Sequence, residues 1–326
     1  MIEVGGVARH LWPQKRCIGR ERGLTVDLEF GPAEEAYLRK RARPSIFVHD
    51  LRTHGRVVWG APDLLARIPP FDVGTIPRED AIHLLFNRAI EQLEAWDRAG
   101  AVSGEALLDV AYQPVKLRLD VAGSALAFAG GHVASYAERP RAFAALLART
   151  PALAAQLPGD VGARLERAAR LKLAPEADDL LPPASPAGAR AWVRREIAAA
   201  MPVLAGVLRW ELGQLLGGDA PLPALLERWI AAPSWRRRAR AWVKLAVHPL
   251  PAPLPLSAWK AVGLARRSTP RALVCAAGTA AYLALGGVHA TGAAARLLPL
   301  AGPAPGSAAA ERAAVTAFWR WCVRND

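Results

Sequence analysis

The chain has 326 residues, of which 52% are hydrophobic and 22% are charged, and its formal net charge at pH 7 is +13. This length and apolar content exclude a wholly disordered protein and allow two or three compact units. The positive charge favours polyanionic partners such as nucleoside triphosphates, and it supports a nucleic-acid partner only weakly because it comes mostly from arginine. Lysine is confined to six positions: Lys15, Lys40, Lys116, Lys172, Lys244 and Lys260.

Cysteine usage and the N-terminal residues both bear on the compartment. Cys17, Cys275 and Cys322 form no C-x-x-C pair, which argues against a disulfide framework and a zinc knuckle. The first residues, MIEVGGVARHLWPQKR, lack the positive-then-apolar order of a signal peptide. We therefore expect a cytoplasmic protein.

The segment 24–60 has the pattern of mixed strand and helix. LTVDLEF alternates in polarity and predicts a strand that carries Asp27 and Glu29. SIFVHDL, which follows Pro44, is an apolar, strand-like run, and the element that it begins is a strand or a helix that closes on a glycine. GRVVWG is a short β-rich segment that ends at a turn.

Helical spacing dominates after Pro77. A small antiparallel helical bundle is predicted from residues 78–96, 104–130 and 140–157, with a kink or break at Pro114. Residues 174–189, rich in Pro, Ala and acidic residues, form the best candidate linker. Further helices are predicted at 190–216, 222–247, 256–265, 270–300 and 308–324.

One uncharged segment, 272–295, has the length of a membrane span. Much of it is Ala and Gly, which contribute little transfer free energy. The pattern therefore favours a buried helical hairpin broken near Gly286 and Gly287 over a membrane partner.

The order of strand, charged segment and glycine-terminated element in 24–60 resembles the late part of the catalytic domain in the nucleotidyltransferase superfamily of DNA polymerase β type. In that family a carboxylate on one strand is the third metal ligand. The resemblance implies that Asp27 binds Mg²⁺, with Glu29 as the second catalytic candidate, during transfer of a nucleotidyl group from an NTP to a hydroxyl acceptor. The alternative is that both residues are exposed acids on an edge strand.

The family's glycine-serine turn and Asp-x-Asp pair do not precede Asp27 at the required spacing. A site with one of three carboxylates cannot place two metal ions. We therefore expect that the chain as it stands does not catalyse transfer.

A second resemblance lies in Tyr112-Gln-Pro-Val-Lys116, Asp120 and the stretch from Gly130 to Arg139. These residues are similar to the helical domain of small-substrate nucleotidyltransferases. The resemblance implies that Lys116, Tyr136 and Arg139 contact the nucleotide, with Lys116 as a point charge on the triphosphate and Arg139 as a forked phosphate ligand. The alternative is an exposed ion pair between Lys116 and Asp120, which are four residues apart.

Two further motifs carry less information. Arg78 and His83 have the Arg-x4-His spacing of HEPN ribonucleases, which chance alone readily produces in an arginine-rich chain. The segment 235–242 interleaves Trp and Arg as single-strand nucleic-acid binders do, but Trp235 and Trp242 also fit the core stripe of an amphipathic helix.

Together these patterns predict an α+β, predominantly α protein. It would contain a partial nucleotidyltransferase-like α/β domain at 1–75, a helical bundle at 76–173, a linker at 174–189 and a helical C-terminal domain at 190–326. The predicted function is that of a nucleotidyltransferase-family protein. The alternative is a non-catalytic helical nucleotide-binding or scaffold protein that pairs with another protein.

Overall fold

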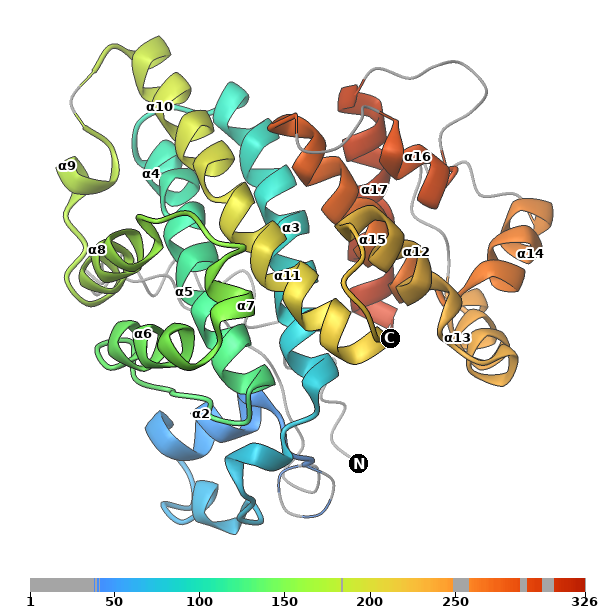
Figure 1. The fold of residues 1–326 in the computed structure, drawn as a ribbon, viewed down its shortest axis with the longest axis horizontal. Helices are drawn as coiled ribbons and strands as arrows, with labels where there is room; N and C mark the ends of the chain where they lie inside the picture. Colours follow the sequence, from blue (N-terminus) through green and yellow to red (C-terminus); the bar gives the residue numbers. More distant parts are fainter. Residues whose placement is uncertain are drawn as a thin grey trace. The chain divides into compact units, whose positions relative to one another are not determined.

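The computed structural model describes residues 38, 40, 42–182, 184–248, 258–287, 292–300 and 308–325. They fall into two compact units, divided between Thr75 and Ile76. Asp27 and Glu29, with the strand predicted around them, lie outside the described residues. Within the described ranges the chain is helical and contains no strand, which confirms the predominantly α prediction (Figure 1).

The strand-like interpretation of SIFVHDL is wrong and the alternative of a helix is confirmed, because these residues form helix α2, Ile46–His54, which ends before Gly55. Ser45 caps the helix, since its hydroxyl accepts a hydrogen bond from Val48 N at 3.1 Å. Val48 and Leu51, three residues apart, share the face that packs against Leu38 and Ile68. Capping and this spacing therefore outweigh the β-propensity of the run.

The β-rich segment expected at GRVVWG is also absent. Residues 55–60 have no regular structure, and the side chains of Val58 and Trp59 are more than nine-tenths exposed. The first unit continues through two short 3-10 helices, Leu65–Arg67 and Val73–Thr75. Its small core contains Leu38, Val48 and Ile68.

The second unit holds the remaining helices (Figure 1). Its first half contains α3 Arg78–Ala101, α4 Glu105–Ala111, α5 Gln113–Phe128, α6 Arg139–Arg149, α7 Pro151–Ala154, α8 Val161–Leu173 and α9 Ala177–Leu180. Its second half contains α10 Pro186–Ala199, α11 Met201–Leu216, α12 Leu222–Ala231, α13 Trp235–Ala246, α14 Ala258–Arg267, α15 Pro270–Leu285, α16 Ala293–Leu297 and α17 Ala308–Asn325.

Proline explains where the structure divides helices that the sequence pattern predicts as continuous. The break expected at Pro114 is confirmed, because α4 ends and α5 begins beside it. Pro202 lies in the first turn of α11 and separates it from α10, and Pro233 lies between α12 and α13. Each proline lacks the N–H that a continuous helix would need.

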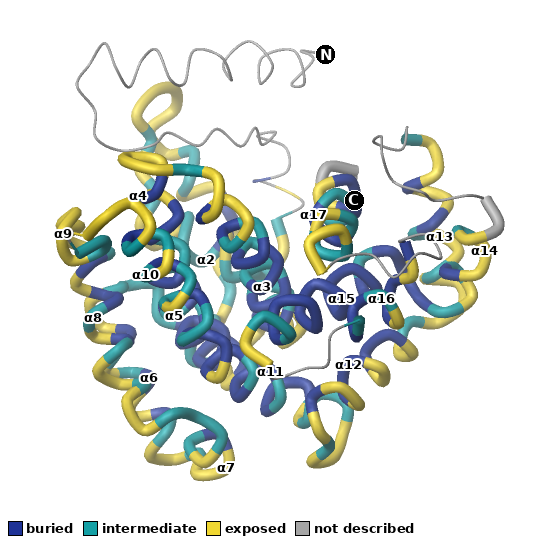
Figure 2. The backbone as a smooth tube through the Cα atoms, turned by 90° about the horizontal axis from the view of Figure 1, so that it is seen from above, coloured by how far each residue is buried: buried dark blue, intermediate teal, exposed yellow. Residues whose placement is uncertain are grey.

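Helix α3 is the centre of the second unit. It contacts α4, α5, α10 and α11 on one side and α15 and α17 on the other (Figure 1). Buried residues follow much of α3 and nearly all of α15 (Figure 2). The helices before and after residues 174–189 therefore share one core.

Helix α15 can approach α3 closely because Gly278 has no side chain. A Cβ atom at this position would lie 2.3 Å from Ile90 Cγ1 of α3. The helix ends at Gly286 and Gly287, and α16 packs against it, so the predicted break and return of the chain are confirmed. In the described ranges, no helix combines the length and the apolar character that a membrane crossing requires.

One chain of polar groups crosses this core. The Ser124 hydroxyl oxygen on α5 lies 2.9 Å from the Ala81 carbonyl oxygen of α3 and 2.6 Å from Glu211 Oε1 of α11. A hydroxyl has one hydrogen and a carbonyl can only accept, so Ser124 donates to Ala81 and the Glu211 carboxyl donates to Ser124. Burial raises the pKa of Glu211 to about 8. Glu211 is therefore protonated in the folded protein at neutral pH.

The raised pKa of the Glu211 carboxyl makes the free energy of unfolding fall as the pH rises. Its carboxyl has an ordinary pKa of 4.5 in the unfolded chain and a pKa of about 8 when folded, so the folded state holds the extra proton between these values. We expect this group to lower the free energy of unfolding by on the order of 3 kcal/mol between pH 5 and pH 8. In Glu211→Gln the side-chain amide can still donate to Ser124 but does not titrate. The decrease in the free energy of unfolding between pH 5 and pH 8 should therefore disappear in this variant.

Urea denaturation at pH 5, 6.5 and 8 measures the effect. Glu227→Gln, an exposed change on α12, is the matched control and should keep the wild-type dependence on pH. Equal slopes for wild type and Glu211→Gln would show that Glu211 is ionised in the core.

Candidate functional site

The break between α4 and α5 positions two of the candidate residues. Gln92 of α3 is fully buried, and its side-chain amide donates to the Gln113 carbonyl at 3.0 Å. This bond holds the start of α5 against α3. Tyr112 lies between α4 and α5. Lys116 follows one turn later, and its backbone N–H donates to the Tyr112 carbonyl at 3.2 Å. The junction of α4 and α5 thus brings an aromatic ring and an ammonium group close together.

Two lysines and two tyrosines from separate segments meet here, and we call Tyr112, Lys116, Tyr136 and Lys172 the lysine–tyrosine cluster. Lys116 Nζ lies 5.7 Å from the centre of the Tyr112 ring. Lys172 Nζ, at the end of α8, lies 5.5 Å from the same ring and 5.2 Å from the ring of Tyr136. Both ammonium groups therefore face aromatic rings at cation–π distance.

The cluster has an excess of positive charge. Among the described residues, no carboxylate forms an ion pair with Lys116 or Lys172. All four side chains are partly exposed, so solvent or a ligand can reach them. The N-terminal end of α5 adds the partial positive charge of its first turn. A polyanion is the ligand that this arrangement favours.

Arg139, the third predicted nucleotide contact, lies beneath the cluster. Its Cζ is 4.5 Å from the centre of the Tyr136 ring, but the residue is only 3% exposed. Its guanidinium donates to backbone carbonyls of Val133 at 3.0 and 3.1 Å, Leu119 at 3.3 Å and Ala134 at 3.4 Å. Gly123 of α5 leaves room for it, since a Cβ atom there would lie 3.3 Å from Nη1. In this structure Arg139 holds the loop before α6 against α5 and supports Tyr136.

Acidic residues near the cluster are neutralised by arginine. Arg88 of α3 forms ion pairs with Asp120 and Glu91, and Asp120 Oδ1 also lies 4.0 Å from Arg139 Nη1. The alternative ion pair between Lys116 and Asp120 is therefore not formed. Burial raises the pKa of the Glu91 carboxyl, while Arg88 and, more weakly, Lys116 lower it. Among the described residues, Lys116 therefore has Glu91 as an electrostatic neighbour but forms no ion pair with a carboxylate.

The alternative motifs are not assembled into sites. Arg78 Cζ lies 5.1 Å above the ring of Phe128 in α5, whereas the ring of His83 packs against Trp229 in α12 at 5.6 Å. In α13, Trp242 is buried as the core-stripe prediction requires, but the prediction is wrong for Trp235, which is 71% exposed.

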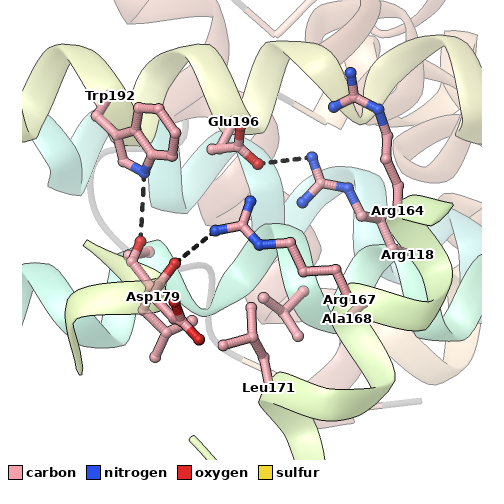
Figure 3. Close-up of a pocket in the computed structure, with 11 residues that line it drawn as sticks. Arg118, Arg164, Arg167, Ala168, Leu171, Asp179, Trp192 and Glu196 are labelled. Atoms are coloured by element: carbon pink, nitrogen blue, oxygen red, sulfur yellow. Dashed lines mark hydrogen bonds and ion pairs between the residues drawn. The ribbon is translucent and has the colours of Figure 1, made fainter. Parts of the chain in front are cut away.

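A small pocket lies on another face of α5 and α8 (Figure 3). It holds the ion pair of Arg118 with Glu196 at 2.8 Å, and Arg167 donates to the Asp179 carbonyl at 2.7 Å (Figure 3). Its cavity volume of about 40 Å³ leaves room for little more than a water molecule. We therefore regard it as a packing contact between α5, α8, α9 and α10 and not as a ligand site.

The sequence patterns missed Lys172, Gln92 and Arg88. Lys172 carried a signal, because lysine is scarce in this arginine-rich chain. Gln92 and Arg88 carried none, since polar residues on a long helix are ordinarily exposed and only tertiary contacts show otherwise.

Comparisons with known protein families, with curated proteins and with solved structures found no match to this chain.

Replacing Arg139 should destabilise the second unit. In Arg139→Ala the carbonyls of Val133 and Leu119 lose buried charged donors, and a void forms beside Gly123. We expect the free energy of unfolding to fall by about 2–4 kcal/mol. Urea denaturation followed by far-UV circular dichroism measures the change.

The matched control is Arg141→Ala, since Arg141 is exposed on the same helix and should change the free energy by less than about 0.5 kcal/mol. Equal effects of the two substitutions would contradict a structural role for Arg139.

Proposed function

We propose that the lysine–tyrosine cluster binds the phosphates of a nucleoside triphosphate, and that the chain is a nucleotidyltransferase-family protein. The observation that supports this most directly is the convergence of Tyr112, Lys116 and Tyr136, three residues of the family-like pattern, with Lys172. They are separated in sequence and come from α5, the loop before α6, and α8.

The chemistry of the cluster suits a triphosphate. A lysine ammonium is a compact point charge with three rotatable donors, which suits oxygens whose orientation varies. The tyrosine rings restrict where each ammonium can lie and offer a flat surface for a ribose or base. Because neither ammonium group forms an ion pair within the described part of the chain, a phosphate does not have to displace a bound carboxylate.

Transfer of the nucleotidyl group would need divalent metal in addition. In the family pattern, Asp27 would be a Mg²⁺ ligand and Glu29 a second carboxylate, with the two metals activating the acceptor hydroxyl and neutralising the leaving pyrophosphate. Arg139 is buried and saturated with carbonyl partners, so in this proposal it supports Tyr136 and does not contact phosphate.

Calorimetric titration of the full chain with ATP tests the binding proposal. We expect Lys116→Ala and Lys172→Ala each to weaken binding about tenfold, the cost of removing one charge-assisted contact. Lys260→Ala, a change at an exposed residue of α14, is the matched control and should leave the affinity unchanged. Affinity that neither cluster substitution alters would contradict the proposal.

The same preparation separates binding from transfer. We expect ATP binding without Mg²⁺-dependent labelling of an acceptor from α-labelled NTP, because one of three carboxylates cannot place two metal ions. Labelling that Asp27→Ala abolishes would contradict this expectation and would show that Asp27 is a metal ligand in an active enzyme.

A further inference from the structure

A second cavity, separate from the lysine–tyrosine cluster, lies at one end of α3. Its volume is about 320 Å³, which falls within the range of pockets that hold small organic molecules. Polar and aromatic residues form one part of its lining: Glu79, His83, Trp229, Arg237, Thr269 and Arg271. Apolar residues at the ends of α11 and α12 form much of the rest.

Three helix N-termini meet at this cavity. Glu79 and His83 belong to the first two turns of α3, Arg237 to the first turn of α13, and Arg271 to the first turn of α15. Side-chain caps fix two of these ends: Ser234 Oγ accepts from Arg237 N at 3.4 Å, and Thr269 Oγ1 accepts from Ala272 N at 3.2 Å. The partial positive charges of these three helix ends add to those of the arginines, and the C-terminal ends of α11 and α12, which also line the cavity, offset them in part.

The arginines outnumber the single acid of the lining. Among the described residues, the guanidinium of Arg237 forms no hydrogen bond and no ion pair, with Glu79 or with any other carboxylate. Arg237 is exposed at the rim and Arg271 is half-buried. The donors of Arg237 are thus available to an acidic group that enters the cavity.

The opposite part of the lining is aromatic. Trp229 is only 9% exposed, and its ring packs against Phe86 at 5.5 Å and His83 at 5.6 Å between ring centres. Its indole Nε1 is buried without a hydrogen-bond partner in the described structure. A buried N–H of this kind is costly.

We propose that this cavity binds a small organic anion that carries an aromatic ring. The acidic group accepts hydrogen bonds from Arg237 and Arg271 at the N-termini of α13 and α15. The ring packs against Trp229 and the apolar ends of α11 and α12. This site does not depend on the nucleotide-binding proposal, because it shares no residue with the lysine–tyrosine cluster.

Two dyes of similar ring structure test the proposal on the full chain. The anionic dye 8-anilinonaphthalene-1-sulfonate should bind with one dye per chain, and the neutral N-phenyl-1-naphthylamine, which lacks the sulfonate, should bind at least about tenfold more weakly. Equal affinities would overturn the anion assignment.

Substitution locates the binding site. Arg237→Glu should weaken binding of the sulfonate more than about tenfold, because an attractive charge becomes repulsive. Arg236→Glu is the matched control: Arg236 precedes Arg237 on α13 but lies over the ring of Trp235 instead of lining the cavity. Equal effects of the two substitutions would show that binding depends on the general positive charge of the surface and not on this cavity, and would overturn the proposal.

Filling the cavity gives an independent variant. Ala241→Trp places a large side chain at the lining and should abolish sulfonate binding, while the near-UV circular dichroism shows that the tertiary structure is retained. Retained binding in a folded Ala241→Trp protein would also overturn the proposal. If that variant does not fold, the comparison of Arg237→Glu with Arg236→Glu decides the question.

Discussion

The burial of α3 on several sides is the constraint on which the second unit depends. A helix surrounded in this way needs apolar residues around much of its circumference, and α3 supplies them from Ala81 to Ala99. Its few inward polar groups are then fixed by partners: Gln92 holds the start of α5, and Arg88 binds Asp120. The lysine–tyrosine cluster and the second cavity both take their positions from α3, one beside its middle and one at its N-terminal end.

Polar bridges determine how the neighbouring helices align with α3. Ser124 joins α5 to the Ala81 carbonyl and to Glu211 of α11, and the Tyr282 hydroxyl of α15 donates to the Ile197 carbonyl of α10 at 2.7 Å. Apolar packing alone tolerates small shifts along a helix axis, whereas a buried hydrogen bond is lost if its partners move apart. We infer that the buried carboxyl of Glu211 costs stability at neutral pH and restricts α11 to one alignment.

The spacing of apolar residues predicted the helical character after Pro77 and the helix from 308. Proline predicted the break at Pro114, and glycine predicted the chain reversal at Gly286 and Gly287. Each of these features has a local cause in the sequence. The strand-like interpretation failed at SIFVHDL, where the Ser45 cap and the spacing of Val48 and Leu51 favour a helix. At the candidate site, Lys116 and Tyr136 were predicted by a family-like pattern. Lys172 and Gln92 depend on tertiary contacts between distant segments, which no local pattern records.

An acyl phosphate derivative of ATP tests the central claim most directly, because it transfers its acyl group to lysine amines that lie beside the bound phosphates. The full chain would be treated with this reagent and the modified lysines identified by mass spectrometry. Our account predicts that Lys116 and Lys172 are acylated and that excess ATP protects both, while Lys244 and Lys260 react only at background level. Labelling without preference among these lysines, or labelling of the cluster that ATP does not reduce, would contradict it.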